Sequence, residues 1–139
     1  MTRHFLTLLD FSPEELAGLI ERGTEHKRMH AAGMIYEPLR GRTLVMLFEL
    51  ASTRTRVAFE ADMHQLGGHA IFLSPNDTQL GRGEPIEDTA RVLSEMADLI
   101  MLRTLDHRDV ETFARAATVP VINAMTGRAH RTSRRSRRA

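Results

Sequence analysis

The sequence contains no cysteine, which excludes a disulfide framework and a thiolate-bound metal. No apolar run approaches the length that spans a bilayer, and Met1-Thr2-Arg3-His4-Phe5 lacks the basic-then-apolar layout of a secretory signal. We therefore expect a cytoplasmic protein without membrane attachment. Apolar residues make up 42% of the 139 positions, which is enough to bury the core of one domain and argues against wholesale disorder.

Acidic residues are absent from the last thirteen positions. Residues 1–126 carry 13 Lys and Arg against 18 Asp and Glu, whereas residues 127–139 add six arginines. We expect a domain over residues 1–126 and a disordered Arg/Ser-rich tail over 127–139. One interpretation of the tail is an out-of-frame or prematurely ended coding sequence, and another is a nucleic-acid-binding arm. Nucleic acid is the less favoured partner, because the tail has no aromatic residue for base stacking and the domain is acidic.

Helical and extended patterns alternate along the chain. Ser12-Pro13-Glu14-Glu15 predicts a helix start with a cap, a proline in the first turn and a capping box. The alternation predicts an α/β fold with a parallel sheet of about four strands flanked by helices. Ligands of such sheets bind outside the carboxyl ends of the strands. The predicted helices cover residues 12–33, 52–66, 86–97 and 108–117, and the predicted strands cover 43–48, 69–73, 98–102 and 119–123.

A candidate anion site follows the first predicted strand, where Ser52-Thr53-Arg54-Thr55 opens a helix. The first turn of a helix offers unpaired N–H groups and a positive dipole end, and arginine can grip phosphate oxygens through two hydrogen bonds. Arg103 follows the third predicted strand and would face the same crevice. The alternative remains open that Ser52 only caps the helix and that Arg54 and Arg56 lie on a solvated surface.

The stretch from Phe48 through Ser52-Thr53-Arg54-Thr55 to Glu60 resembles the carbamoyl-phosphate signature of the carbamoyltransferases. The segments 63–70 and 79–91 resemble ornithine carbamoyltransferases more than aspartate ones. The resemblance covers about residues 5–126. It implies transfer of the carbamoyl group from carbamoyl phosphate to the δ-amine of ornithine, giving citrulline and phosphate in arginine biosynthesis. It also implies a homotrimer and no metal or organic cofactor.

The same resemblance assigns roles to individual residues. Ser52, Thr53, Arg54 and Thr55 would bind the phosphate group, and Arg103 would contact both the phosphate and the carbamoyl oxygen. Arg54 and Arg103 are the expected catalytic residues. The remaining two carbamoyl-phosphate residues are Gln79, on a loop that reaches into the neighbouring subunit's site, and His130, the expected ligand of the carbamoyl oxygen.

The sequence also departs from the family pattern. His130 lies at the family spacing from Arg103, but Arg131-Thr132-Ser133 replaces the expected Pro-x-Gln, so His130 is either that ligand or a coincidence. Glu49-Leu50-Ala51 lacks the expected lysine. The family's ornithine-binding domain has no counterpart, which leaves ornithine or an N-acylated ornithine open as acceptor. We expect an incomplete half that transfers nothing unless the second domain is supplied. The alternative is a non-catalytic carbamoyl-phosphate-binding module or remnant.

Overall fold

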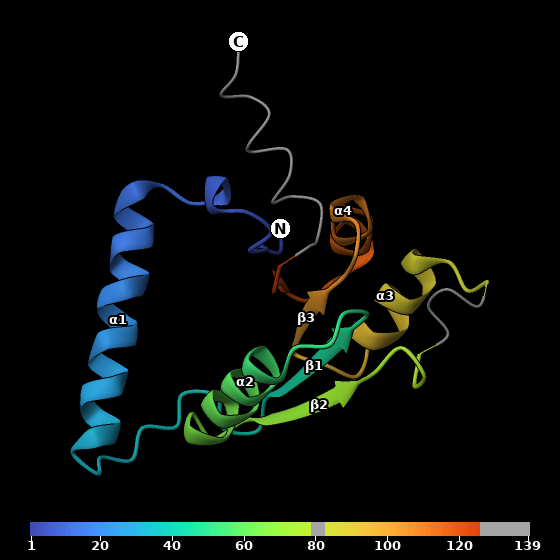
Figure 1. Cartoon of the computed structure of the whole chain (residues 1–139). Coiled ribbons are helices and arrows are strands. Elements are labelled where there is room, and N and C mark those ends of the chain that lie inside the picture. The colour runs from blue at the N-terminus through green and yellow to red at the C-terminus, as the bar shows by residue number, and fades with distance from the viewer. Residues whose placement is uncertain (79–82, 126–139) are drawn as a thin grey trace.

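A computed structural model describes residues 1–78 and 83–125 and contains a four-stranded parallel sheet (Figure 1). The strand order is β2-β1-β3-β4, so β1 lies inside the sheet between β2 and β3. Both the α/β class and the parallel sheet of four strands are confirmed. The strands are β1 (Thr43–Phe48), β2 (His69–Leu73), β3 (Leu99–Arg103) and β4 (Val121–Asn123).

Four α-helices connect or precede the strands, and Figure 1 shows α2 on one side of the sheet and α3 and α4 on the other. A short 3₁₀ helix, η1 (Leu8–Asp10), was not predicted; the side chain of Thr7 caps it and Asp10 completes the capping box. The α-helices are α1 (Pro13–Ala31), α2 (Thr53–Gln65), α3 (Ile86–Ser94) and α4 (His107–Ala116).

The core lies on both faces of β1, where every residue from Leu44 to Phe48 is buried. Val45 and Leu47 join the cluster formed with α3 and α4. Leu44, Met46 and Phe48 pack on the opposite face with Met63 of α2. Alternate side chains of a strand point to opposite faces, so a continuous apolar run is what a strand covered on both sides requires. Strand β1 is therefore covered on both faces.

Three predicted boundaries are wrong by two or three residues. Helix α1 ends at Ala31 and not at Gly33. Helix α3 ends at Ser94 and not at Ala97, because the N–H of Met96 donates to the carbonyl of Leu93 and tightens the last turn. Strand β4 begins at Val121 and not at Val119. The intervening Pro120 has no N–H to donate to a ladder, and its carbonyl accepts from the N–H of Ile100 instead.

The Gly67-Gly68 pair closes α2, with the N–H of Gly67 donating to the carbonyl of His64 and the N–H of Gly68 to the carbonyl of Met63. Gly67 has a φ of 82°, in the left-handed region that glycine adopts freely. A Cβ placed at Gly67 would lie 2.7 Å from the Cβ of Glu37. The turn therefore requires glycine for its backbone conformation and for its close approach to the segment before β1.

The N-terminal segment extends the sheet beyond β4, which the sequence did not predict. The N–H of Phe5 donates to the carbonyl of Val121 at 2.8 Å, and the N–H of Asn123 donates to the carbonyl of Phe5 at 2.8 Å. Phe5 also packs edge-on against Phe11, with 4.7 Å between ring centroids. The start of the chain is thereby fixed beside the last strand.

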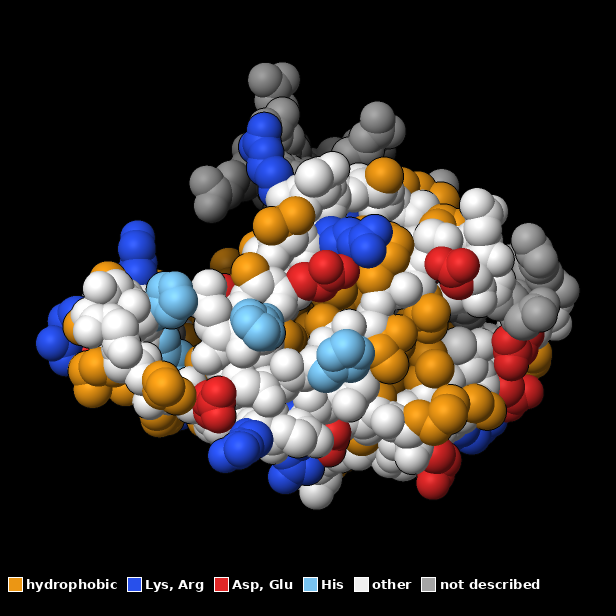
Figure 2. Space-filling model, turned by 90° about the horizontal axis from the view of Figure 1, so that it is seen from below, with side chains coloured by type: hydrophobic (Ala, Val, Ile, Leu, Met, Phe, Trp, Pro, Cys, Tyr) orange, Lys and Arg blue, Asp and Glu red, His pale blue; other side chains and the backbone are white. Residues whose placement is uncertain are grey.

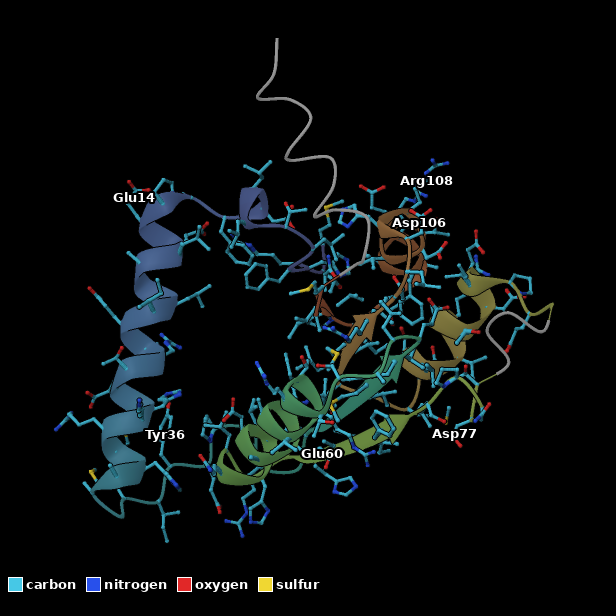
Figure 3. The ribbon with its side chains drawn as sticks, viewed as in Figure 1. Glu14, Tyr36, Glu60, Asp77, Asp106 and Arg108 are labelled. Atoms are coloured by element: carbon cyan, nitrogen blue, oxygen red, sulfur yellow. The ribbon has the colours of Figure 1, made fainter. Side chains whose placement is uncertain are left out.

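Helix α1 stands apart from the sheet in Figure 1 and has no buried residue. Its start is joined to the N-terminal segment by the ion pair of Arg3 with Glu15, and its end lies beside Tyr36, which contacts His26 (Figure 3). None of the helices within residues 1–78 and 83–125 has both the length and the apolar character that crossing a lipid bilayer demands.

Candidate functional site

The carboxyl ends of β1 and β3 lie side by side at the point where the sheet reverses its direction of winding. From β1 the chain passes through α2 to β2 on one side, whereas β3 lies on the other side of β1. Open parallel sheets bind ligands at such a switch point. The register pairs Phe48 with Arg103, so the last residues of both strands are at the same level. The sequence-predicted arginine therefore faces the loop that leads into α2.

Ser52 is the N-cap of α2 and shapes its first turn. The N–H of Thr55 donates to the Ser52 hydroxyl oxygen at 3.4 Å, and that hydroxyl donates to the Thr55 hydroxyl at 2.9 Å. Ser52 and Thr55 are half-buried, whereas Thr53 and Arg54 are exposed. The capping role is thus present, and the same turn keeps N–H groups and the Arg54 side chain available to an anion.

Arg103 is held at the edge of the sheet with part of its guanidinium unused. Its Nη1 donates to the carbonyl oxygen of Ala124 at 2.9 Å. Its Nε is buried and has no hydrogen-bond partner among residues 1–78 and 83–125. A buried N–H without a partner is costly, so it marks a position where an acceptor would be favourable.

Neither Arg54 nor Arg103 forms an ion pair within the described part of the chain. The six ion pairs of that part involve Arg3, Arg28, Arg42, Arg56, Arg91 and His107 instead. Two unpaired guanidinium groups beside a helix N-terminus make the site suitable for a compact dianion.

Arg56 belongs to a different surface, although it follows the same signature. Its Nε donates to Glu60 at 2.9 Å, and its guanidinium lies over the ring of Phe72, 3.6 Å from the centroid. Glu60 is labelled on α2 in Figure 3. These contacts tie the side chain to α2 and β2, so the alternative of a surface role holds for Arg56.

Glu49 links the two strand ends. Its N–H donates to the carbonyl of Arg103 at 2.8 Å, and its carboxylate accepts from the N–H of Leu105 at 3.3 Å. The segment after Arg103 is closed further on by Asp106, which accepts from the N–H of Arg108 and caps α4 (Figure 3). The backbone on both sides of the switch point is therefore connected by hydrogen bonds.

Two predicted site residues, Gln79 and His130, lie outside the described residues. The contacts of Asn123, the last residue of β4, and of Ala124, which follows it beside Arg103, were not predicted from the sequence. The signal that could have found them is the position of Asn123 at the carboxyl end of the fourth strand. Among residues 1–78 and 83–125, no three His, Asp or Glu side chains are grouped as a metal site requires.

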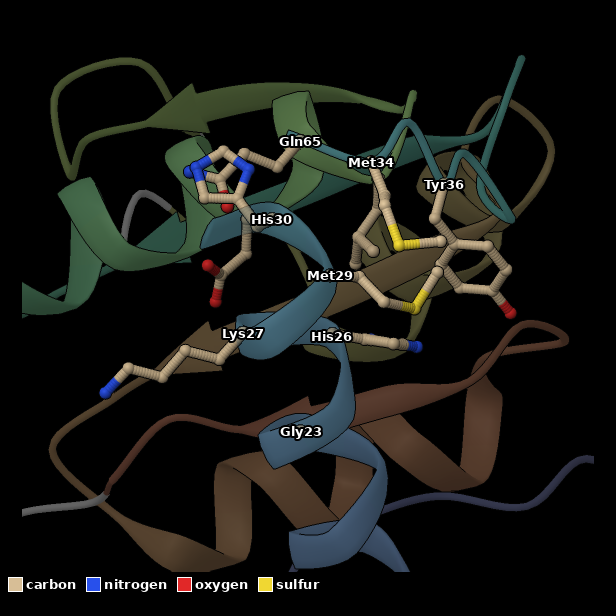
Figure 4. A pocket seen from close by; sticks show the side chains of 10 residues that line it. Gly23, His26, Lys27, Met29, His30, Met34, Tyr36 and Gln65 are labelled. Atoms are coloured by element: carbon tan, nitrogen blue, oxygen red, sulfur yellow. The ribbon is translucent and has the colours of Figure 1, made fainter. Parts of the chain in front are cut away.

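A hollow of about 320 Å³ lies elsewhere, between the second half of α1 and the end of α2 (Figure 4). It is lined by His26, Lys27, His30 and Tyr36 on one side and by Gln65 on the other. Figure 2 shows the molecule from below, where apolar side chains are exposed among histidine and acidic ones. The α2 residues of this hollow are at the helix end opposite to Ser52, so it is separate from the switch point.

Comparisons with known proteins agree with this geometry. The family model of the aspartate/ornithine carbamoyltransferase carbamoyl-P binding domain matches residues 3–133. The chain is 62% identical over 128 residues to an ornithine carbamoyltransferase of Psychrobacter sp. (strain PRwf-1), and the match covers 92% of this chain and 42% of that relative. The chain therefore spans less than half the length of the curated relatives that it matches.

Solved structures show the same fold. An ornithine carbamoyltransferase from Burkholderia thailandensis is 52% identical with a TM-score of 0.85, covering 89% of this chain and 43% of the other. An aspartate transcarbamoylase from Trypanosoma cruzi in complex with carbamoyl phosphate is 28% identical with a TM-score of 0.83, covering 90% and 39%.

Proposed function

The chain belongs to the aspartate/ornithine carbamoyltransferase family, and on that premise we propose that the switch point binds carbamoyl phosphate. The observation that carries the proposal is the pairing of Phe48 with Arg103, which brings Arg103 to the loop before α2. In this proposal the phosphate group occupies the first turn of α2, where Ser52, Thr53, Arg54 and Thr55 surround it. The relative solved with carbamoyl phosphate has the same fold and supports this choice of anion.

We further propose that the site serves transfer of the carbamoyl group to ornithine. The δ-amine attacks the carbamoyl carbon, and the bond from that carbon to the phosphate oxygen breaks. Phosphate leaves with the electron pair of that bond and takes up the proton that the amine loses. Negative charge grows on the carbamoyl oxygen and on the departing phosphate. Arg54, Arg103 and the N-terminus of α2 are suited to stabilise it, because donors fixed in advance need no reorganisation during the reaction.

A narrower function, binding of carbamoyl phosphate without transfer, is the second candidate. It is favoured by one observation: all the described site residues are assigned to carbamoyl phosphate, and none to the amino-acid acceptor. The relatives named ornithine carbamoyltransferase favour transfer. A trimer, in which Gln79 of one subunit completes the site of another, is the assembly that we propose for either function.

The first test is calorimetric titration of carbamoyl phosphate into the 139-residue chain after circular dichroism has shown that it is folded. We expect saturable binding, and Arg54→Ala should weaken it about 10- to 100-fold, because a charge-assisted hydrogen bond contributes roughly 1.5–3 kcal/mol. Arg28→Ala is the matched control: it removes the same charge from the second half of α1, where Arg28 is paired with Glu25, and should leave the affinity unchanged.

A second assay separates the two candidates. Citrulline formed from carbamoyl phosphate and ornithine would support transfer, whereas binding without citrulline would support the narrower function. A folded chain that does not bind carbamoyl phosphate would contradict the site proposed at the switch point.

A further inference from the structure

The side chain of Arg103 is oriented by a turn that follows β4. The carbonyl oxygen of Ala124 accepts from Nη1 of Arg103 at 2.9 Å, and the N–H of Ala124 donates to the carbonyl of Leu102 at 2.8 Å. The peptide groups of Ala124 are therefore bonded both to β3 and to the arginine at its end. Any change in the turn would change where the guanidinium lies.

The turn contains an unfavourable backbone conformation. Met125 has a φ of 88°. Within residues 1–78 and 83–125, every other residue with a positive φ is a glycine. Side chains with a Cβ rarely adopt this region because the Cβ approaches the neighbouring carbonyl oxygen. Such a conformation persists only where the surroundings impose it.

The side chain of Asn123 contacts this turn. Its Oδ1 accepts from the N–H of Met125 at 3.1 Å, which closes the turn around Ala124. Its Nδ2 donates to the carbonyl of Leu6 at 2.9 Å and lies 3.5 Å from Nδ1 of His107. One amide therefore joins the turn, the N-terminal segment and the first residue of α4.

We propose that Asn123 is a positioning residue that sets the orientation of Arg103 before carbamoyl phosphate binds. The amide holds Met125 in the left-handed conformation, which directs the Ala124 carbonyl at Nη1 of Arg103. With Nη1 engaged and Nε buried without an acceptor among residues 1–78 and 83–125, the remaining donors of the guanidinium are fixed at the switch point. Donors that are already oriented lose less conformational entropy when an anion binds. This inference rests on the proposed carbamoyl-phosphate site and adds the device that orients its arginine.

The test compares Asn123→Ala, Met125→Gly and the double variant with the unchanged chain, each shown to be folded by circular dichroism. The first readout needs no ligand: the NMR order parameter of the Arg103 Nε–H, assigned by its disappearance in Arg103→Lys. We expect Asn123→Ala to lower this order parameter. Met125→Gly alone should leave it unchanged, since glycine adopts positive φ freely. The double variant should recover at least part of the loss, because glycine removes the need for the amide.

The second readout is the affinity for carbamoyl phosphate. Asn123→Ala should weaken binding about tenfold, which corresponds to about 1.4 kcal/mol, and the same substitution should have no further effect in an Arg103→Ala background. Asn123→Asp keeps an oxygen for the Met125 N–H but loses the donor to Leu6. Its affinity for carbamoyl phosphate should therefore lie between that of the unchanged chain and that of Asn123→Ala.

An unchanged Arg103 order parameter in folded Asn123→Ala would overturn the proposal. The proposal would also be overturned if the double variant had an Arg103 order parameter as low as that of Asn123→Ala. These outcomes do not depend on ligand. If the unchanged chain binds no carbamoyl phosphate, the proposed function fails while the order parameters still decide the role of Asn123.

Discussion

Helix α4 has ten residues and buries three of its side chains, Val110, Phe113 and Ala114, against the sheet. Helix α1 has 19 residues, and none of its own residues is buried. Both helices begin with a side-chain cap, from Asp106 in α4 and from Ser12 in α1. The difference is in what their apolar residues contact. Those of α4 join the core cluster of β1 and β3, while Leu19 and Ile20 of α1 are 46% and 72% exposed.

The comparison separates two contributions to structure. Caps, first-turn carboxylates and i,i+3 ion pairs such as that of Arg28 with Glu25 are local and can define where a helix begins and ends. The position of a helix in the fold requires an apolar face with a partner surface. In α4 both contributions are present, but in α1 the described residues supply only the local one.

The largest expected difference between the two regions is in the free energy of unfolding. Phe113 is 1% exposed in the cluster of α3, α4 and the sheet, so Phe113→Ala should destabilise the chain by about 3–5 kcal/mol through lost burial and a cavity. Ile20→Ala, in the exposed face of α1, should change stability by less than about 0.5 kcal/mol. Urea unfolding of both variants measures the two values.

If Phe113→Ala and Ile20→Ala lost the same free energy of unfolding, the distinction between a packed α4 and an unpacked α1 would be wrong. A large loss for Ile20→Ala would mean that α1 is packed against another surface in solution, for instance in an assembly. Size-exclusion chromatography of the same samples would then show whether a second copy supplies that surface.

Local sequence patterns predicted elements correctly in both regions. The pattern of residues 43–48 indicated a strand, and the Ser12 capping box indicated the start of α1; both are confirmed. The bridge of Phe5 to Ile122 was missed because its two partners are 117 positions apart and no local pattern relates them. The 3₁₀ helix was missed because three residues are too short for a periodic signal.

For the site, the sequence indicated which residue types follow each strand, but not which strands are neighbours. Arg103 and Ser52 are brought together by the order β2-β1-β3-β4, which depends on long-range pairing. The contact of Arg103 with the Ala124 carbonyl is a backbone interaction, and a side-chain motif does not encode it. Arg56 shows the reverse case: it stands in the signature, yet its partners are Glu60 and Phe72.

A smaller effect comes from one substitution made in both regions. Thr89 of α3 is buried, and its hydroxyl has no hydrogen-bond partner within residues 1–78 and 83–125, whereas the exposed Thr24 of α1 donates to the carbonyl of Ile20. Thr89→Val removes a desolvated hydroxyl at nearly constant volume and should stabilise the chain by about 1 kcal/mol. Thr24→Val should be neutral within about 0.5 kcal/mol.

Thermal and urea unfolding of the two valine variants give the comparison directly. A loss of stability in Thr89→Val would show that its hydroxyl does have an acceptor in solution. In that case the packed region would depend on a polar contact as well as on burial.

The smallest expected effect concerns the attachment of α1 to the N-terminal segment, and it depends on pH. The Arg3 guanidinium, with help from the Ser12 N–H, lowers the pKa of Glu15 from 4.5 to about 2. Because the pKa is lower in the folded chain, the pair stabilises the fold above about pH 4.5, and this contribution is lost as the pH falls from 4.5 towards 2. The side chains are about half exposed, so salt should weaken the effect.

Carboxyl NMR titration of the unchanged chain and of Arg3→Met would measure it. In Arg3→Met the pKa of Glu15 should rise towards 4.5, though not fully, because the Ser12 N–H remains. Glu25 is the internal control: its pKa is lowered by Arg28 of the same helix and should not respond to Arg3. If the pKa of Glu15 were already near 4.5 in the unchanged chain, the Arg3 contact would be absent in solution. Among the described residues, helix α1 would then be held beside the sheet by the connecting backbone and by its contacts near Tyr36, which would widen the contrast with α4.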